Sequence, residues 1–260
     1  MFDVIVIGGG HAGAEAAHAV FRQGLNCCLV TFKKTAIGQM SCNPAIGGLG
    51  KSHLVREVDA LGGIMAQATD LSGIQSRTLN TRKGFAVQAL RVQCDRDKYK
   101  QAIQDLLSQT NITIKEGEVV DIIVKNGSAC GVELSSGEKI TSTKTILTTG
   151  TFLNGVMYKG DEKTSGGRVG DETSIPLSKR LYELKLPMGR LKTGTPPRIK
   201  LSSIDLNMME EQPGDQSPPP MSILKPPKNK LPQTVCYITR TNKTTHNIIK
   251  NNTHLSAMYS

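Results

Sequence analysis

The sequence predicts an α/β fold that opens with a strand, a glycine-rich turn, a helix and a second strand. Residues 4–7 are all β-branched, which is typical of a strand buried on both faces. A glycine-rich turn follows at once, and residues 14–22 are rich in helix-forming residues. Gly24 ends this helix, and residues 27–30 are expected to form the second strand. This order is the start of a βαβ unit with parallel strands.

The glycine-rich turn fits the pattern G-x-G-x-x-G of dinucleotide-binding proteins. It consists of Gly8, Gly9, Gly10, His11, Ala12 and Gly13. Gly8 would make the tight turn, Gly10 would leave room for a pyrophosphate, and Gly13 would let the helix pack against the strand. The pattern alone is weak, but here it follows a strand directly and opens a helix. The alternative is a glycine-rich turn in another kind of α/β protein.

The residue that would normally hold a cofactor ribose is absent. An acidic residue is expected at the end of the second strand, but Thr31 stands there, with Lys33 and Lys34 close behind. A hydroxyl could still bond a ribose, whereas the lysines would suit an extra phosphate. This position leaves the identity of the cofactor open.

A later segment favours FAD. Residues 145–150 resemble the strand and glycine that return the chain to FAD in flavoproteins with two dinucleotide-binding domains. Short strands between about residues 112 and 142 suit the small β-sheet that commonly precedes this segment. The alternative is a plain buried strand that ends in a turn. We therefore expect a Rossmann-like FAD-binding domain of this type, with small β insertions.

Composition divides the chain near residue 200. Residues 1–200 are expected to form the FAD-binding domain, and residues 201–260 a Pro-rich connector and the start of a second, truncated domain. Pro, Gly and Ser dominate residues 187–232, which predicts loops and an extended connector instead of a packed core.

The chain is basic, with a formal net charge of +10. Residues 181–260 hold 11 Lys and Arg against 5 Asp and Glu. A basic excess attracts polyanions, so nucleic acid or an acidic membrane surface is a reasonable partner; the alternative is a solvated basic surface. Aromatic residues make up only 4% and Trp is absent, which disfavours a module that stacks single-stranded bases.

The six cysteines predict neither a disulfide framework nor a metal site. None forms C-x-x-C, and no Cys/His cluster has metal-ligand spacing. The start of the chain carries no signal-peptide pattern, and no apolar run approaches the roughly 20 residues of a membrane span. A cytoplasmic protein without membrane contact is expected.

A second glycine-rich stretch superficially resembles a phosphate-binding loop. Residues 45–52 match a relaxed P-loop, but residues 39–44 cannot form the hydrophobic strand that must precede one. No apolar strand ending in Asp follows as a magnesium partner. An NTPase is therefore disfavoured.

Four unusual motifs and the first glycine turn carry a family resemblance. The motifs are GQMSCNPAIGG from Gly38, EVDALGG from Glu57, SGGRVGD from Ser165 and GRLKTGTPPR from Gly189. In this order they closely resemble the tRNA uridine 5-carboxymethylaminomethyl modification enzymes, the MnmG/GidA family. The resemblance runs from residue 2 to the end of the sequence.

The resemblance implies an FAD enzyme that acts on the wobble uridine of tRNA. The family is understood to use NADH as reductant and methylenetetrahydrofolate as one-carbon donor, and to attach an aminomethyl or carboxymethylaminomethyl group at C5. It implies a homodimer that works with an MnmE-type GTPase, two copies of each forming a heterotetramer. Family members are longer and carry later cofactor and partner segments, so the fold here is expected to be incomplete.

The resemblance also assigns residues. The cofactor would touch the six residues of the first glycine turn and, further along, Val119 and Ser174. Cys42 matches a cysteine implicated in catalysis. This suits the chemistry because uridine C5 becomes nucleophilic when a thiolate attacks C6; the alternative is a structural thiol.

The basic residues in the last motif suit contact with tRNA phosphates. They are Arg190, Lys192 and Arg198, followed by Lys200. A solvated basic loop is the alternative. Other readings of the whole chain are a folate- and FAD-dependent tRNA uridine methyltransferase, a simple NAD(P)H oxidoreductase, and an inactive basic fragment that binds nucleic acid.

Overall fold

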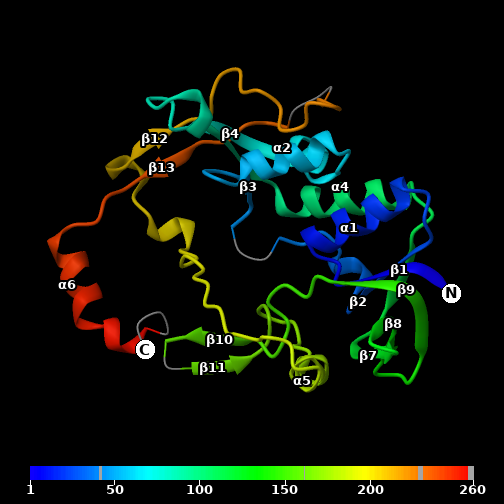
Figure 1. The fold of residues 1–260 in the computed structure, drawn as a ribbon. Helices are drawn as coiled ribbons and strands as arrows, with labels where there is room; N and C mark the ends of the chain where they lie inside the picture. Colours follow the sequence, from blue (N-terminus) through cyan, green and yellow to red (C-terminus); the bar gives the residue numbers. More distant parts are fainter. Residues whose placement is uncertain (41–42, 161, 228–230, 257–260) are drawn as a thin grey trace.

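The centre of the fold is a six-stranded sheet whose strands lie in the order β6-β2-β1-β9-β8-β7. The computed structural model describes residues 1–40, 43–160, 162–227 and 231–256 (Figure 1). The strands of this sheet are β1 (Phe2–Ile7), β2 (Cys27–Thr31), β6 (Thr113–Glu116), β7 (Val119–Lys125), β8 (Ser128–Leu134) and β9 (Lys139–Leu147). β6, β2, β1 and β9 run parallel, while β8 and β7 continue the sheet antiparallel to β9 and to each other.

Three small sheets accompany the central one. They are the three-stranded sheet β3 (Ala45–Gly47), β5 (Ala89–Cys94) and β4 (Gly73–Leu79), the pair β10 (Val156–Lys159) and β11 (Glu162–Ser165), and the pair β12 (Glu210–Gln212) and β13 (Cys236–Ile238). The pairings within all three are antiparallel.

Six α-helices and five short 3-10 helices lie in the described ranges. The α-helices are α1 (His11–Arg22), α2 (Ser52–Ala60), α3 (Met65–Ser72), α4 (Arg96–Ser108), α5 (Ile175–Glu183) and α6 (Lys243–Asn251). The 3-10 helices are η1 (Lys34–Ala36), η2 (Phe85–Val87), η3 (Leu201–Ser203), η4 (Leu206–Met208) and η5 (Thr253–Leu255). None of the helices described is long and apolar enough to cross a membrane.

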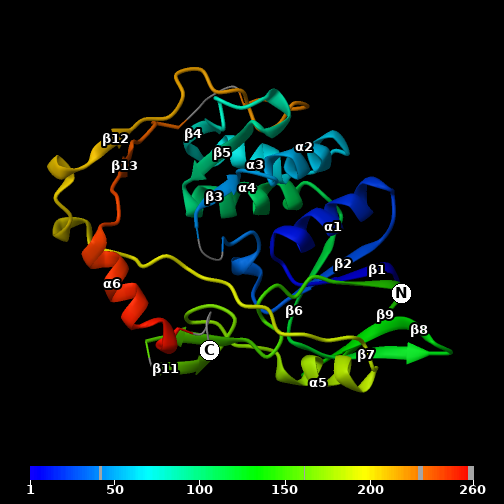
Figure 2. The ribbon, with the colours of Figure 1, turned by 60° about the vertical axis from the view of Figure 1, so that its left-hand side comes forward.

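β1 and β2 are buried on both faces, as their β-branched and apolar sequences predict. Val4 and Val6 point into a core shared with α1, α4 and the β3–β5 layer. Ile5 and Ile7 point into a second core with β7, β8 and α5. Figures 1 and 2 show the same arrangement, with α1 on one side of the parallel strands and β7, β8 and α5 on the other. The predicted α/β class with a parallel sheet is confirmed.

The small β-sheet begins later than expected. β6 was expected in it from about residue 112, but it lies parallel to β2, with Thr31 opposite Glu116. The antiparallel part starts at Val119 and ends within β9. We expected one strand that ends near residue 142 and another that leads to Gly150, but β9 is continuous from Lys139 to Leu147. The first half of β9 pairs with β8, and from Ser142 onward it pairs with β1 alone among the described strands. Ile146 and Leu147 on this second half are more than one-third exposed.

The Pro-rich segment is mostly irregular, as predicted, but it is anchored in the core at one place. Met221 and Ser222 have no exposed surface, and Met221 belongs to the core beneath α1 and α4. Two acidic residues hold this place. Asp70 accepts hydrogen bonds from the N–H groups of Met221 and Ser222, both at 2.8 Å. The division at residue 200 stays a prediction.

Asp59 is the second anchor of this segment. It is 1% exposed and accepts hydrogen bonds from the Ser222 hydroxyl at 2.8 Å and from the N–H of Ile223 at 2.7 Å. A buried carboxylate is stable only when such donors surround it. The sequence showed no local sign of this contact, because its two sides are more than 160 residues apart.

Replacing Asp59 with Ala should lower the free energy of unfolding by about 2 to 4 kcal/mol, because it leaves these buried donors without an acceptor. Glu57→Ala is the matched control: Glu57 is exposed on the same helix, and its loss should change stability by less than about 0.5 kcal/mol. Urea unfolding of both variants measures the difference. Equal effects would show that the anchor does not stabilise the fold.

Candidate functional site

The carboxyl ends of β1, β2, β6 and β9 meet at one edge of the sheet, and the glycine turn lies there. Gly8 N–H donates to the carbonyl of Val30 at 2.8 Å, which ties the turn to β2. Thr148 N–H donates to the carbonyl of Ile7 at 2.9 Å, which ties the segment after β9 to β1. In open parallel sheets this edge is where ligands bind.

The glycines of the turn have different surroundings. Gly8 has φ +106°, and a Cβ there would lie 2.4 Å from the carbonyl oxygen of Thr148. At Gly13 a Cβ would lie 1.7 Å from the carbonyl oxygen of Gly8, so only glycine lets α1 approach β1 this closely. Gly9 is also enclosed, by Ile37 and Thr31.

Gly10 differs from the other glycines because a Cβ there would meet nothing within 4 Å. Gly10 caps the amino end of α1, and no side chain of the described residues accepts the free N–H groups of this helix end. Open space at an uncapped helix amino terminus suits a phosphate, through N–H donors and the helix dipole. The turn therefore fits a dinucleotide, with room where its pyrophosphate would lie.

His11 is the first residue of α1 and is paired with Tyr99 of α4. The Tyr99 hydroxyl lies 3.3 Å from Nδ1 of His11, and the two rings meet edge to face. Burial lowers the pKa of His11 from its ordinary value, and burial raises the pKa of Tyr99. Both side chains are therefore neutral at neutral pH. An imidazolium, which would oppose the positive end of the helix dipole, is avoided.

The acidic group missing at the end of β2 has a counterpart on β6. Glu116 stands opposite Thr31, and its Oε2 accepts a hydrogen bond from the N–H of Lys34 at 2.9 Å. A carboxylate thus reaches the segment after β2 from the neighbouring strand. The role of Glu116 is not visible in the sequence, because only the pairing of β6 with β2 places it here.

Val119 and Ser174 lie together although 55 residues separate them. The Ser174 hydroxyl donates to Oε1 of Glu118 at 2.9 Å and lies 3.4 Å from the carbonyl oxygen of Val119. Ser174 N–H also donates to the carbonyl of Phe152 at 2.8 Å. Both Val119 and Ser174 are 4% exposed. The Val119 side chain packs in the core and the Ser174 hydroxyl is engaged by Glu118, so any cofactor contact would have to use their backbone atoms.

An aromatic contact connects this pair to the glycine turn. Phe32 follows β2 directly, and its ring lies 6.1 Å from the ring of Phe152, centroid to centroid. The ring of Phe152 also lies beneath the Arg168 guanidinium, 5.8 Å from centroid to guanidinium carbon. Thus the SGGRVGD motif, the end of β2 and the Val119–Ser174 pair form one continuous region beside the sheet edge. No spacing in the sequence reveals Phe32 or Phe152.

The expected catalytic residue Cys42 lies outside the described residues. Three other cysteines are buried, and burial raises the pKa of Cys27 to about 12 and the pKa values of Cys28 and Cys94 to about 11. They are protonated at neutral pH and cannot act as nucleophiles. Among the described residues, no three His, Cys, Asp or Glu side chains converge as a metal site.

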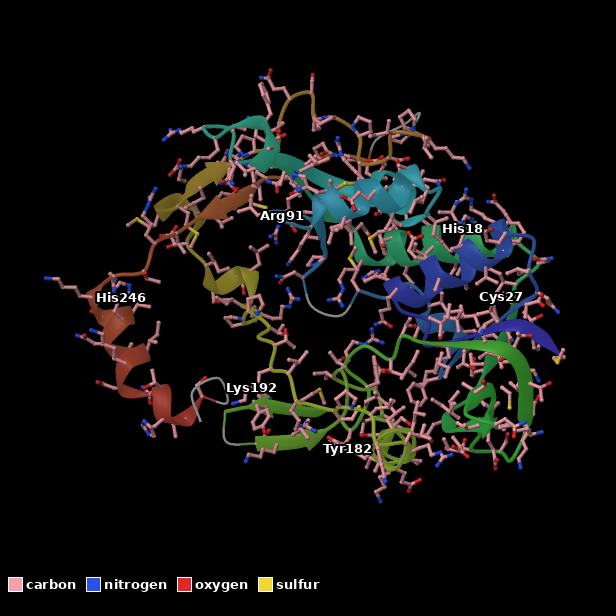
Figure 3. The ribbon with its side chains drawn as sticks, in the orientation of Figure 1. His18, Cys27, Arg91, Tyr182, Lys192 and His246 are labelled. Carbon is pink, nitrogen blue, oxygen red and sulfur yellow. The ribbon has the colours of Figure 1, made fainter. Side chains whose placement is uncertain are left out.

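The three basic residues expected to contact tRNA lie on the exposed, extended segment between α5 and η3. Arg190 donates a hydrogen bond to the carbonyl of Asn154 at 3.2 Å, and Lys192 and Arg198 also have partners. Figure 3 shows Lys192 above β10 and β11, away from α1. The structure does not bring these residues to the glycine turn.

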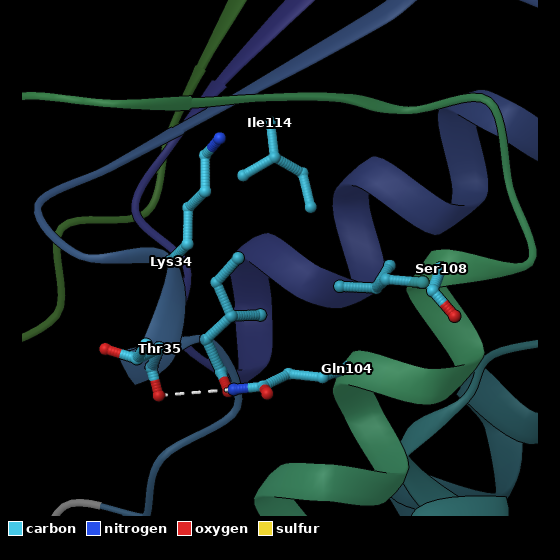
Figure 4. Close-up of a pocket in the computed structure, with 7 residues that line it drawn as sticks. Lys34, Thr35, Gln104, Ser108 and Ile114 are labelled. Atoms are coloured by element: carbon cyan, nitrogen blue, oxygen red, sulfur yellow. Dashed lines mark hydrogen bonds between the residues drawn. The ribbon is translucent and has the colours of Figure 1, made fainter.

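A shallow cavity of about 210 Å³ lies beside α4 (Figure 4). Its lining is Lys34, Thr35, Ile37, Gln104, Leu107, Ser108 and Ile114. Gln104 closes one side, because its amide donates to the carbonyls of Thr35 and Ile37. None of the expected cofactor residues lines this cavity, so it is separate from the site at the glycine turn.

The parallel sheet, the glycine turn and the uncapped helix end define a Rossmann-like α/β protein of the dinucleotide-binding class. A family model described as glucose inhibited division protein A matches residues 3–260. The chain therefore belongs to the glucose inhibited division protein A (GidA) family.

Solved structures agree with this assignment. GidA from Aquifex aeolicus in crystal form I is 46% identical, with a TM-score of 0.93 over 100% of this chain and 44% of that one. Crystal form II gives 47% identity and a TM-score of 0.91 over 97% of this chain and 43% of that one. A GidA-related protein from Thermus thermophilus, 16% identical, shares the fold with a TM-score of 0.52 over 70% and 68%. The chain thus spans less than half the length of the Aquifex protein.

Gly13→Ala should destabilise the fold by more than about 3 kcal/mol, because its methyl group would overlap the backbone of Gly8. Gly10→Ala is the matched control on the same turn. It meets open space at a negative φ and should change stability by about 1 kcal/mol or less. Thermal unfolding of the two variants measures this contrast, and similar midpoints would refute the close approach of α1 to β1.

His11 should make the fold less stable in mild acid. Since burial lowers its pKa, the unfolded chain binds this proton more readily than the folded chain. Stability is then lost as the pH falls below about 6.5, with a slope of at most about 1.4 kcal/mol per pH unit. Urea unfolding across this range should show a smaller loss in His11→Gln.

The control for this prediction is His53→Gln, an exposed histidine on α2. It should lose as much stability in acid as the unmodified chain does. The pKa of His18 is also lowered, mainly by burial. Because His18 is present in all three proteins, its contribution to the acid response is the same in each. An unchanged acid response in His11→Gln would contradict the prediction.

Proposed function

We propose that this chain is the FAD-holding part of a flavoprotein that modifies tRNA. The observation that carries the proposal is the open, uncapped amino end of α1 in front of Gly10. Membership in the GidA family supports it. The large basic excess of the chain suits an RNA substrate.

The residues of the sheet edge suit FAD as follows. The N–H groups that begin α1 would hold the pyrophosphate, with Gly10 leaving the space and Gly8 and Gly13 fixing the turn. His11 and Ala12 would take part through their backbone. Glu116 and Thr31 are the polar groups that would hold a ribose, and the backbone of Val119 and Ser174 would contact the same cofactor. FAD, once bound, supplies two-electron redox chemistry, for which NADH is the proposed reductant.

We further propose the chemistry of the family for the complete protein. The substrate is the wobble uridine of tRNA, modified at C5 with an aminomethyl or carboxymethylaminomethyl group whose carbon comes from methylenetetrahydrofolate. Cys42 is the proposed nucleophile at uridine C6, because it matches a cysteine implicated in catalysis in the family. Arg190, Lys192 and Arg198 would contact tRNA phosphates. An MnmE-type GTPase, a homodimer and a cytoplasmic location complete this proposal.

Gly10→Asp should strongly weaken FAD binding without unfolding the chain. Its carboxylate would enter the open space and occupy the place of the pyrophosphate, where two anions repel each other. We expect FAD affinity to fall at least about 100-fold, since a charge-assisted phosphate contact contributes about 3 kcal/mol. Flavin fluorescence during FAD titration measures affinity.

Gly84→Asp is the matched control, because it adds the same charge where a Cβ also meets open space, but at η2. This variant should bind FAD like the unmodified chain. Failure of the folded, unmodified chain to bind FAD, or equal affinities in all three proteins, would refute the proposal. Tight tRNA binding without flavin would then favour the basic, non-catalytic fragment.

A further inference from the structure

Two arginines stand side by side on the three-stranded sheet. In the register of β4 and β5, Arg77 lies directly opposite Arg91. Side chains at directly opposite positions share one face of a sheet and are close neighbours, so equal charges there repel. Neither guanidinium takes part in an ion pair among the described residues. An uncompensated pair of cations is unusual on partly buried strand positions.

The pleat of β5 shows which face carries this pair. Leu90, Val92 and Cys94 point into the core. Alternate residues point to the other face, so Arg91 and its neighbour Gln93 lie away from that core. Figure 3 shows Arg91 on the inner side of the curved ribbon, with Lys192 across from it. Both arginines are only partly exposed.

The donors of the two guanidinium groups are largely unused. One N–H of Arg77 donates to the carbonyl of Pro213 at 2.9 Å, and its other donors have no partner among the described residues. The guanidinium of Arg91 makes no hydrogen bond to any described residue. On its other side Arg91 faces Gly47 of β3, which has no side chain. The Arg91 guanidinium therefore has donors that no described residue uses.

The third strand of this sheet, β3, comes shortly after Cys42, the expected nucleophile, in the sequence. β3 begins at Ala45, three residues after Cys42 in the sequence, and Ala45 pairs with Gln93. By contrast, Gln75, opposite Gln93 on β4, is fully engaged: its amide donates to the carbonyl of Gln212, and its Oε1 accepts from Cys236. The cationic donors that the register brings together on this face are thus Arg91 and Arg77.

We propose that Arg77 and Arg91 form a subsite for one oxyanion, either a carboxylate or a phosphate. Two guanidinium groups can each present a fork of N–H donors, which matches the paired oxygens of these anions. A bound anion also removes the repulsion between the two cations. The subsite is distinct from the glycine turn, lies on another sheet, and does not depend on FAD binding.

The experiment titrates the 260-residue chain with inorganic phosphate and, separately, with acetate, at constant ionic strength and without FAD. The Nε–H resonances of the arginine side chains report binding, and the Arg91 signal is identified by its loss in Arg91→Gln. Arg91→Gln should weaken binding of the preferred anion at least about tenfold. Arg91→Lys should weaken it less, because it keeps the charge but loses the fork.

Two controls separate this subsite from general charge and from the cofactor site. Arg82→Gln removes the same charge from an exposed turn between β4 and β5 and should bind like the unmodified chain. Gly10→Asp, which blocks the helix end, should leave the response of the Arg91 signal unchanged. Stronger response to phosphate points to an RNA or nucleotide ligand, and stronger response to acetate to a carboxylate substrate.

The proposal is overturned in three cases. The first is that neither anion gives a saturable response of the Arg91 signal. The second is that Arg91→Gln and Arg82→Gln weaken binding equally, which would mean diffuse attraction by charge. The third is that only Gly10→Asp weakens anion binding, which would place the anion at α1. Circular dichroism of each variant confirms that the fold is retained.

Discussion

The contact between the first turn of α1 and the end of β1 is the constraint on which the site depends. Gly13 lies against the carbonyl oxygen of Gly8, and Thr148 closes the same place by bonding through its N–H and its hydroxyl to Ile7. This contact fixes where the helix begins relative to the sheet edge. The N–H groups at that end are thereby held toward solvent at Gly10 before any ligand arrives, so binding requires little reorganisation.

β9 joins the two halves of the central sheet because it changes partners along its length. Its first half belongs to the antiparallel strands and its second half to the parallel ones. The start of β7 lies beside the end of β2 for another reason: β7 follows β6 after two residues, and the N–H of Gly117 donates to the carbonyl of Thr31 at 2.9 Å. Ser174 reaches the same place through its bond to Phe152, whose ring packs against Phe32, so Val119 and Ser174 meet there although they are distant in sequence.

The sequence predicted local features and missed those that depend on distant partners. The strand, turn and helix from Phe2 to Arg22 were recognisable because their signal lies in consecutive residues. β6 was expected in the small antiparallel sheet but pairs with β2, since the sequence of a short strand does not determine which strand it pairs with. The anchor at Asp59, the carboxylate of Glu116 and the pairing of Arg77 with Arg91 all follow from register or long-range contact. No local pattern encodes them.

The second half of β9 has a consequence for how this chain behaves at high concentration. Beyond Thr141 its outer edge meets no other described strand, and the side chains of Ile146 and Leu147 are partly exposed beside it. Such an edge is a template on which an extended segment of another molecule can add as a new strand. Intermolecular β-strand addition is therefore the expected route to aggregation, and any segment that occupies this edge also protects the chain from it.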